Sequence, residues 1–98
     1  MKQLLVKECA KAFDVPSELI VGASRKGRVI PARFALYKAL RLRGWSYLAI
    51  GRFLGRDHAT VMHGTKRAEW MAERDAEYAA KVQRIADWKP AAIEETEQ

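Results

Sequence analysis

Apolar residues recur along most of the chain at steps of three and four, which is the period of an α-helix that buries one face. This period predicts helices over residues 2–13, 31–43, 47–54, 58–74 and 75–88, with a short helical turn from residue 16 to about residue 20. No stretch shows the strict apolar–polar alternation of a half-buried strand. The pattern therefore predicts an all-α fold, a compact bundle of about five to six helices.

Capping residues indicate where these helices begin and end. Ser46 and Asp57 can accept hydrogen bonds from the first backbone N–H groups of the fourth and fifth helices. Gly44 and Gly55 can adopt the left-handed backbone that ends the helices before them. Residues 22–29, which read GASRKGRV, have no period and are expected to form a loop.

The length and composition predict one domain. We expect it to cover residues 1–89, because Pro90 stops the last helix, and we expect residues 90–98 to be an acidic, disordered tail. No apolar run approaches the roughly 18 residues of a membrane span, and charges interrupt the N-terminal segment MKQLLVKECAKAF, so a cytoplasmic protein is expected. The single cysteine, Cys9, is expected to be a small buried hydrophobe.

Charge is distributed unevenly along the chain. Residues 1–67 hold fourteen Lys or Arg against four Asp or Glu, or +10, whereas residues 68–98 hold four against eight, or −4. A region of one sign attracts polyanions, and this favours nucleic acid as the partner and a nucleoid-associated location. A solvated basic face that only keeps the protein soluble is the alternative. Between Glu18 and Asp57 there is no acid but nine basic residues, namely Arg25, Lys26, Arg28, Arg33, Lys38, Arg41, Arg43, Arg52 and Arg56.

The stretch 50–67, IGRFLGRDHATVMHGTKR, has the spacings of a helix-turn-helix. This motif needs a small residue where its helices cross, a residue that tolerates positive φ in the turn, and an apolar anchor in the second helix. Gly51, Gly55 and Val61 meet these three requirements.

At 100° per residue, a fifth helix with Val61 inward buries one side and exposes the other. The side predicted to be buried consists of Val61, Gly64, Thr65, Ala68 and Ala72. The side predicted to face outward consists of Ala59, His63, Lys66 and Trp70, flanked by Thr60, Met62 and Arg67. This outer side has no acid before Glu69, and with the positive end of the helix dipole at its tip it suits the DNA major groove.

The residues at the tip of this helix can be given individual roles. Arg56 can bind guanine or phosphate, and His58 can contact a base edge or a phosphate. Asp57 can cap the helix only, or cap it and also accept from a cytosine amino group. Ala59 offers a methyl group to thymine, and Thr60 offers a hydroxyl to base or phosphate.

We expect no metal, no cofactor, no small-molecule substrate and no catalysis. His58 and His63 are separated by about 140° around a helix, so they cannot share a ligand face. Asp57 and His58 are chain neighbours without an accompanying nucleophile. The 98 residues contain no G-x-x-x-x-G-K-[ST] loop for ATP.

The same stretch resembles the C-terminal DNA-binding domain of the bacterial replication initiator DnaA, with its signature Ile-Gly-x-x-Phe-Gly-Gly-Arg-Asp-His-x-Thr-Val-x-His-Ala. Upstream, SRKGRVIPARFALYKALR is similar to that family's basic loop and long helix, and the likeness covers roughly residues 4–88. It implies a helix-turn-helix bundle of the Trp-repressor-like type. The signature residues present here are Ile50, Gly51, Gly55, Arg56, Asp57, His58, Thr60, Val61 and His63.

The resemblance also implies a mode of DNA binding, in which Arg-Asp-His-x-Thr reads the major groove while a basic-loop arginine enters the adjacent minor groove. The loop cannot be aligned residue by residue, the turn is one glycine shorter, and Ala59 replaces the usual threonine, so the target is expected to differ from a standard initiator box. By similarity, the major-groove residues are Arg56, Asp57, His58, Ala59 and Thr60, and the minor-groove residue is one of Arg25, Lys26 and Arg28. We also assign His63 to the major groove, and Arg33, Ser46, Lys66 and Arg67 to phosphate contacts.

We therefore expect a sequence-specific double-stranded DNA-binding protein, in first place a transcription regulator that activates by presenting another surface to RNA polymerase or a co-activator. Small DnaA-like proteins of phages, or those controlling gene-transfer-agent particles, are the type in view. One alternative is an origin-box binder that modulates initiation of replication. Another is a protein-interaction module whose basic face meets an acidic partner, and no membrane partner is expected.

Overall fold

The computed structural model describes residues 2–90. The all-α prediction is confirmed, with six helices and no strand in this range. No helix within it is both long enough and apolar enough to cross a membrane. The predicted tail from residue 91 onward lies outside the described residues, so the division near residue 90 stays a prediction. The helices are α1 (Lys2–Phe13), α2 (Ser17–Val21), α3 (Val29–Leu42), α4 (Tyr47–Leu54), α5 (His58–Arg74) and α6 (Ala76–Asp87).

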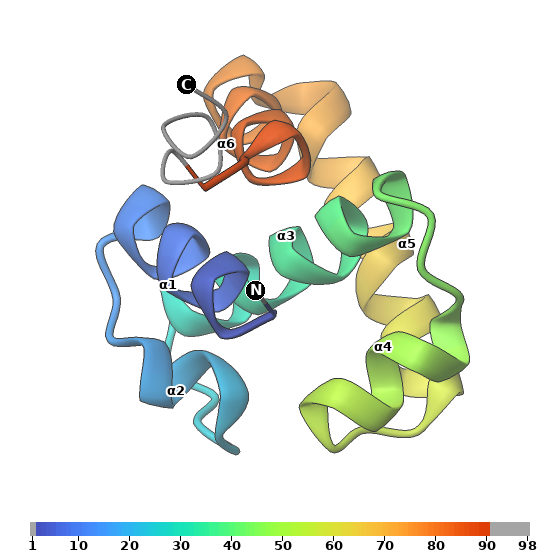
Figure 1. The fold of residues 1–98 in the computed structure, drawn as a ribbon. Coiled ribbons are helices and arrows are strands. Elements are labelled where there is room, and N and C mark those ends of the chain that lie inside the picture. Colours follow the sequence, from blue (N-terminus) through green and yellow to red (C-terminus); the bar gives the residue numbers. More distant parts are fainter. Residues whose placement is uncertain (1, 91–98) are drawn as a thin grey trace, which may run out of the picture.

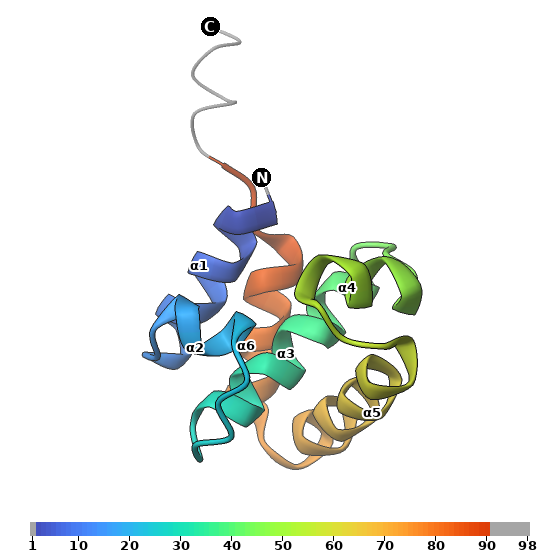
Figure 2. The ribbon, with the colours of Figure 1, turned by 90° about the horizontal axis from the view of Figure 1, so that it is seen from below.

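Helix α3 is the centre of the bundle, and it packs against each of the other five helices. Figure 1 shows α1 and α2 on one side of it, α4 and α5 on the other, and α6 at the top. Figure 2, turned by 90°, shows the same division, with α4 and α5 together on the side away from α1 and α2. The position of α1 and α2 relative to α4 and α5 is therefore set by their packing on α3.

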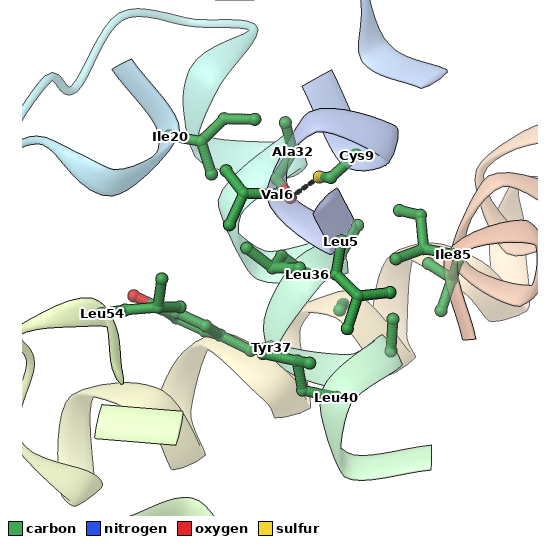
Figure 3. Close-up of a cluster of buried hydrophobic side chains, with 14 of the residues drawn as sticks. Leu5, Val6, Cys9, Ile20, Ala32, Leu36, Tyr37, Leu40, Leu54 and Ile85 are labelled. Atoms are coloured by element: carbon green, nitrogen blue, oxygen red, sulfur yellow. Dashed lines mark hydrogen bonds between the residues drawn. The ribbon is translucent and has the colours of Figure 1, made fainter. Parts of the chain in front are cut away.

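Apolar side chains from all six helices meet in one core around α3. Figure 3 shows part of this cluster, with side chains of α1, α2, α4 and α6 directed toward those of α3. Burying one large apolar side chain contributes about 1.5–3 kcal/mol, so this core is the main stabilising feature. The largest fully buried side chains are those of Tyr37, Leu5, Ile20, Leu36, Leu40, Ile50, Ile85 and Val61.

Cys9 takes the role expected of it. The residue is fully buried, and its Sγ donates a hydrogen bond to the carbonyl oxygen of Ala32 at 3.2 Å (Figure 3). Burial raises the pKa of the thiol to about 12. Cys9 is therefore a neutral, packed side chain at physiological pH.

Helix α6 is fastened to α1 and α3 by polar contacts as well as by its apolar stripe. The hydroxyl of Tyr78 donates to the carbonyl oxygen of Pro31 at 2.7 Å. Nε of Arg84 lies 2.6 Å from a carboxylate oxygen of Glu8. The guanidinium of Arg43, just after α3, donates to carbonyl oxygens at the end of α6. The apolar stripe of α6, made of Tyr78, Val82 and Ile85, is buried and closes the core of this same chain.

The start of α3 differs from the prediction. We expected the helix to open at Pro31, but it begins at Val29, so the loop covers residues 22–28. Proline is tolerated there because the first backbone N–H groups of a helix have no partner within the helix, and Pro31 therefore loses no bond. Val29 itself is buried, which ties the end of the loop to the core.

Candidate nucleic-acid interface

Helices α4 and α5 form a helix-turn-helix with the geometry that the sequence predicts. Gly51 lies at the crossing, where an added Cβ would collide with the backbone carbonyl oxygen of Arg56. Gly55 ends α4 with a φ of 70°, in the left-handed region where glycine has no steric penalty. Val61, the anchor of the second helix, is fully buried. These features fix the angle at which α5 leaves the turn.

Both helices of the motif have side-chain caps at their N-termini. Oδ1 of Asp57 accepts a hydrogen bond from the backbone N–H of Thr60 at 2.8 Å, and Oγ of Ser46 accepts from that of Ala49 at 3.0 Å. The hydrogen bonds from Thr60 hold the pKa of Asp57 below its ordinary value, so the cap is charged at neutral pH.

Helix α5 presents one buried and one accessible face. Val61, Gly64, Thr65 and Ala68 are buried, and an added Cβ on Gly64 would lie 2.6 Å from the ring of Tyr37, which shows how closely α5 approaches α3. The first acid of the helix, Glu69, is paired with Lys38 of α3 at 2.8 Å. The accessible face therefore stays basic. Its exposed residues are His58, Ala59, Thr60, His63, Lys66, Arg67 and Trp70.

The loop between α2 and α3 carries three exposed basic residues. Arg28 is the one already engaged: its guanidinium donates to the carbonyl oxygen of Asp14 at 3.2 Å and lies 3.9 Å from the carboxylate of the same residue. Arg25 and Lys26 form no ion pair with a carboxylate of residues 2–90. Of the three, Arg28 alone has an ion pair with a carboxylate among the described residues, and its side chain is still 73% exposed.

An open hollow joins the loop to the tip of α5. Its volume is about 770 Å³. Arg25 belongs to its wall on the loop side, Arg56 to its wall at the turn of the helix-turn-helix, and Asp57 is the one carboxylate on it. One minor-groove candidate, Arg25, and five of the six residues predicted for the major groove thus border one concave surface, whereas His58, Lys26 and Arg28 do not line it. The hollow is lined by Ala23, Arg25, Ile30, Arg33, Phe34, Tyr37, Arg56, Asp57, Ala59, Thr60 and His63.

Comparison with known proteins gives the family. Residues 3–68 match the family model described as the bacterial DnaA protein helix-turn-helix. The chain belongs to this family. Its relatives include the chromosomal replication initiator protein DnaA of Bacteroides thetaiotaomicron, 39% identical over 83 residues, and that of Deinococcus deserti, 33% identical over 82 residues. Each alignment covers 83% of this chain but 18% of the relative, so the chain spans less than a fifth of their length.

Another relative, the chromosomal replication initiator protein DnaA of Anaplasma marginale, is 38% identical over 78 residues, which are 78% of this chain and 17% of that protein. The DnaA-family match runs from α1 to Ala68, so it includes the basic loop, the whole turn and the accessible face of α5 as far as Arg67. The described fold is accordingly a DNA-binding helix-turn-helix domain of the DnaA family.

The prediction that Arg33 contacts phosphate from the surface is wrong. Its side chain is buried, because Arg33 lies on the inward face of α3, four residues after Val29 and four before Tyr37. Nε and Nη2 donate to backbone carbonyl oxygens of α2 and the loop at 2.8–2.9 Å. Burial, and then the nearby charge of Arg56, lower the pKa of Arg33. Arg33 is a structural residue in the wall of the site.

Arg56 also turns toward the loop. It is half-buried, and it donates through Nη1 to the carbonyl oxygen of Leu54 at 3.1 Å and through Nη2 to that of Gly22. Burial raises the pKa of Tyr37, which also lines the hollow, and the neighbouring Arg56 opposes this rise. Arg56 lines the hollow, and its contact with a base or a phosphate stays a prediction.

Sequence reasoning missed that arginines hold the loop and the end of α6. The apolar stripe of α3 contained the signal for Arg33, since this residue falls among the inward positions between Val29 and Tyr37. A charged residue on a buried stripe must find polar partners within the fold. No comparable signal in the sequence points from Arg56 to Gly22, which lies 34 residues away.

Proposed function

We propose that this protein binds double-stranded DNA sequence-specifically, with α5 in the major groove and the loop of residues 22–28 in the adjacent minor groove. The observation that carries the proposal is that the tip of α5 and the basic loop border the same open hollow. Adjacent grooves of a duplex are separated by one sugar-phosphate strand, so a protein that enters both must leave room for that strand. The hollow provides this room, and its Arg25 and Arg56 provide positive charge.

The exposed tip of α5 is the part that reads bases. His58, Ala59 and Thr60 occupy the first turn, and His63 follows on the accessible face. The first residues of a recognition helix are those that reach base edges. Asp57, exposed at the N-terminus of the helix that it caps, joins them as a hydrogen-bond acceptor.

Phosphate contacts come from the periphery of this surface. Lys66 and Arg67 are exposed on α5 beyond the reading residues, and Ser46 is exposed at the N-terminus of α4, where backbone N–H groups and the helix dipole favour an anion. In the minor groove, Arg25 and Lys26 are favoured over Arg28, because Arg28 is engaged with Asp14. Such contacts position the protein on the duplex without reading its sequence.

The biological role that we propose first is regulation of transcription, as an activator that also contacts RNA polymerase or a co-activator. Trp70 supports a second contact surface, because the residue is 47% exposed and lies far along α5 from the tip. The guanidinium carbon of Arg67 is 4.9 Å from the centroid of its ring, and that of Arg74 is 4.1 Å from it. Exposed tryptophan and arginine are enriched where proteins meet. The second candidate is binding at a replication origin, which the names of the relatives favour.

Selection from pooled duplex oligonucleotides at low ionic strength tests the DNA-binding proposal. We expect one preferred site, with a major-groove part and a neighbouring A·T-rich part for the loop. His58→Ala should change the selected sequence, whereas the control Lys66→Ala should weaken binding without changing it. Equal affinity of the unmodified protein for all duplexes would overturn the proposal.

Genome-wide occupancy of the tagged, full-length protein separates the two roles. Peaks at promoters, together with changed transcript levels when the protein is deleted, support transcription control. Peaks confined to a replication origin support the second candidate instead.

A further inference from the structure

The guanidinium of Arg33 donates hydrogen bonds to the end of α2 and to the start of the loop. Its Nε donates to the carbonyl oxygen of Ile20 at 2.8 Å, and its Nη2 donates to those of Leu19 at 2.8 Å, Gly22 at 2.9 Å and Ser24 at 2.9 Å. The last carbonyl oxygens of a helix lack partners within it. Arg33 supplies these partners from α3, and so determines where the loop leaves the body of the protein.

Arg56 meets the same loop from the helix-turn-helix. Its Nη2 donates to the carbonyl oxygen of Gly22, which also accepts from Arg33. A carbonyl oxygen has two lone pairs and can accept both bonds. Gly22 is therefore the point where α3, the basic loop and the turn before α5 are joined by hydrogen bonds.

No carboxylate within residues 2–90 forms an ion pair with Arg33 or Arg56. Both guanidinium groups are held by backbone carbonyl oxygens. They lie close enough to each other that the charge of Arg56 lowers the pKa of Arg33. Carbonyl oxygens fix their positions without cancelling their charge. The arrangement thus fixes the loop and keeps the wall of the hollow positive.

We propose that Arg33 is a positioning residue for DNA binding, which holds the loop in the place where it meets the minor groove, and that the bond from Arg56 to Gly22 sets the loop relative to α5. This inference rests on the proposed function, in which the loop contacts DNA. The loop contains Gly22 and Gly27, and without a clamp it would have to be ordered when the duplex binds. A preordered loop avoids that loss of affinity.

The test is Arg33→Gln, with Arg43→Gln as the matched control. Arg43 also donates to backbone carbonyl oxygens, those of Ala86 and Trp88 at 2.8 Å and of Ile85 at 3.4 Å, but they belong to the end of α6. Both variants remove one charge and one set of guanidinium–carbonyl bonds. Binding to the selected site is measured at a temperature where circular dichroism shows each variant to be folded.

We expect Arg33→Gln to bind the selected site about tenfold more weakly, which corresponds to re-ordering roughly one loop residue on binding. The loss should lie mainly in faster dissociation, and the preference for the A·T-rich part of the site should decrease. Arg43→Gln should bind within about twofold of the unmodified protein, whatever its melting temperature.

A double-mutant cycle separates positioning from general stability. In a background with Arg25, Lys26 and Arg28 replaced by alanine, Arg33→Gln should reduce affinity less than about twofold, because there is no longer a basic loop to position. A tenfold loss in both backgrounds, or no loss in either, overturns the inference while leaving sequence-specific binding intact. If the unmodified protein prefers no duplex at all, the proposed function fails, and the inference fails with it.

Discussion

Replacing Gly51 by alanine tests the tight crossing of α4 and α5. The new Cβ would overlap the backbone carbonyl oxygen of Arg56, and since carbon–oxygen contacts lie at about 3.3 Å or more, the turn would have to move by about 1 Å. Overpacking of this kind costs about 1–3 kcal/mol, and backbone yields less than a flexible side chain, so we take the upper end. Alanine recovers about 1 kcal/mol of helix propensity. The net expectation is a loss of about 2 kcal/mol in the free energy of unfolding.

For a domain of this size, that loss lowers the melting temperature by about 8–16 °C, which circular dichroism at 222 nm can follow. Gly27→Ala is the control, because a Cβ there has no heavy atom within 4 Å, and its expected effect is within about 0.5 kcal/mol. DNA affinity should also decrease for Gly51→Ala, measured below its transition, because the displaced turn changes how α5 is presented. If Gly51→Ala melted within about 2 °C of the unmodified protein, the reasoning about this crossing would be refuted.

Other predictions concern single side chains. His58→Ala should reduce discrimination between the selected site and single base-pair variants by about 1–3 kcal/mol, while Lys66→Ala should weaken binding to all duplexes alike and reduce the salt slope by about one, as titrations at several salt concentrations would show. A salt slope unchanged in Lys66→Ala would remove this residue from the phosphate contacts. Cys9 should resist iodoacetamide in the folded protein, because it is buried and its pKa is raised to about 12, and should react once the chain is unfolded; mass spectrometry reports both states. The cap at Asp57 has a lowered pKa, so its stabilisation is present above the ordinary value of 3.8 and is lost as the pH falls through the lower value in the folded protein. Asp57→Asn, which keeps a capping oxygen, should therefore flatten the acid side of the stability curve, and an identical pH profile would contradict this.

The features predicted correctly from the sequence are those that depend on near neighbours in the chain. The helical period, the caps at Ser46 and Asp57, and the glycines at 51 and 55 each act within a few residues. The inward setting of Val61 then determined which side of α5 is accessible, because a helix rotates by a constant angle per residue. The start of α3 was placed two residues late, since proline marks the first turn of a helix without marking its first residue.

The sequence by itself thus determined the helical architecture, the helix-turn-helix and the accessible face of α5. Only the tertiary structure decided that Arg33 is turned inward to the loop, that Arg56 reaches Gly22, and that the loop and the tip of α5 border one hollow. These features depend on the packing of α2, α3 and the turn after α4, which are brought together by the shared core. A long, flexible arginine side chain can reach carbonyl groups at many sequence separations. Its position in the sequence does not indicate which of these groups the fold will place within hydrogen-bonding distance.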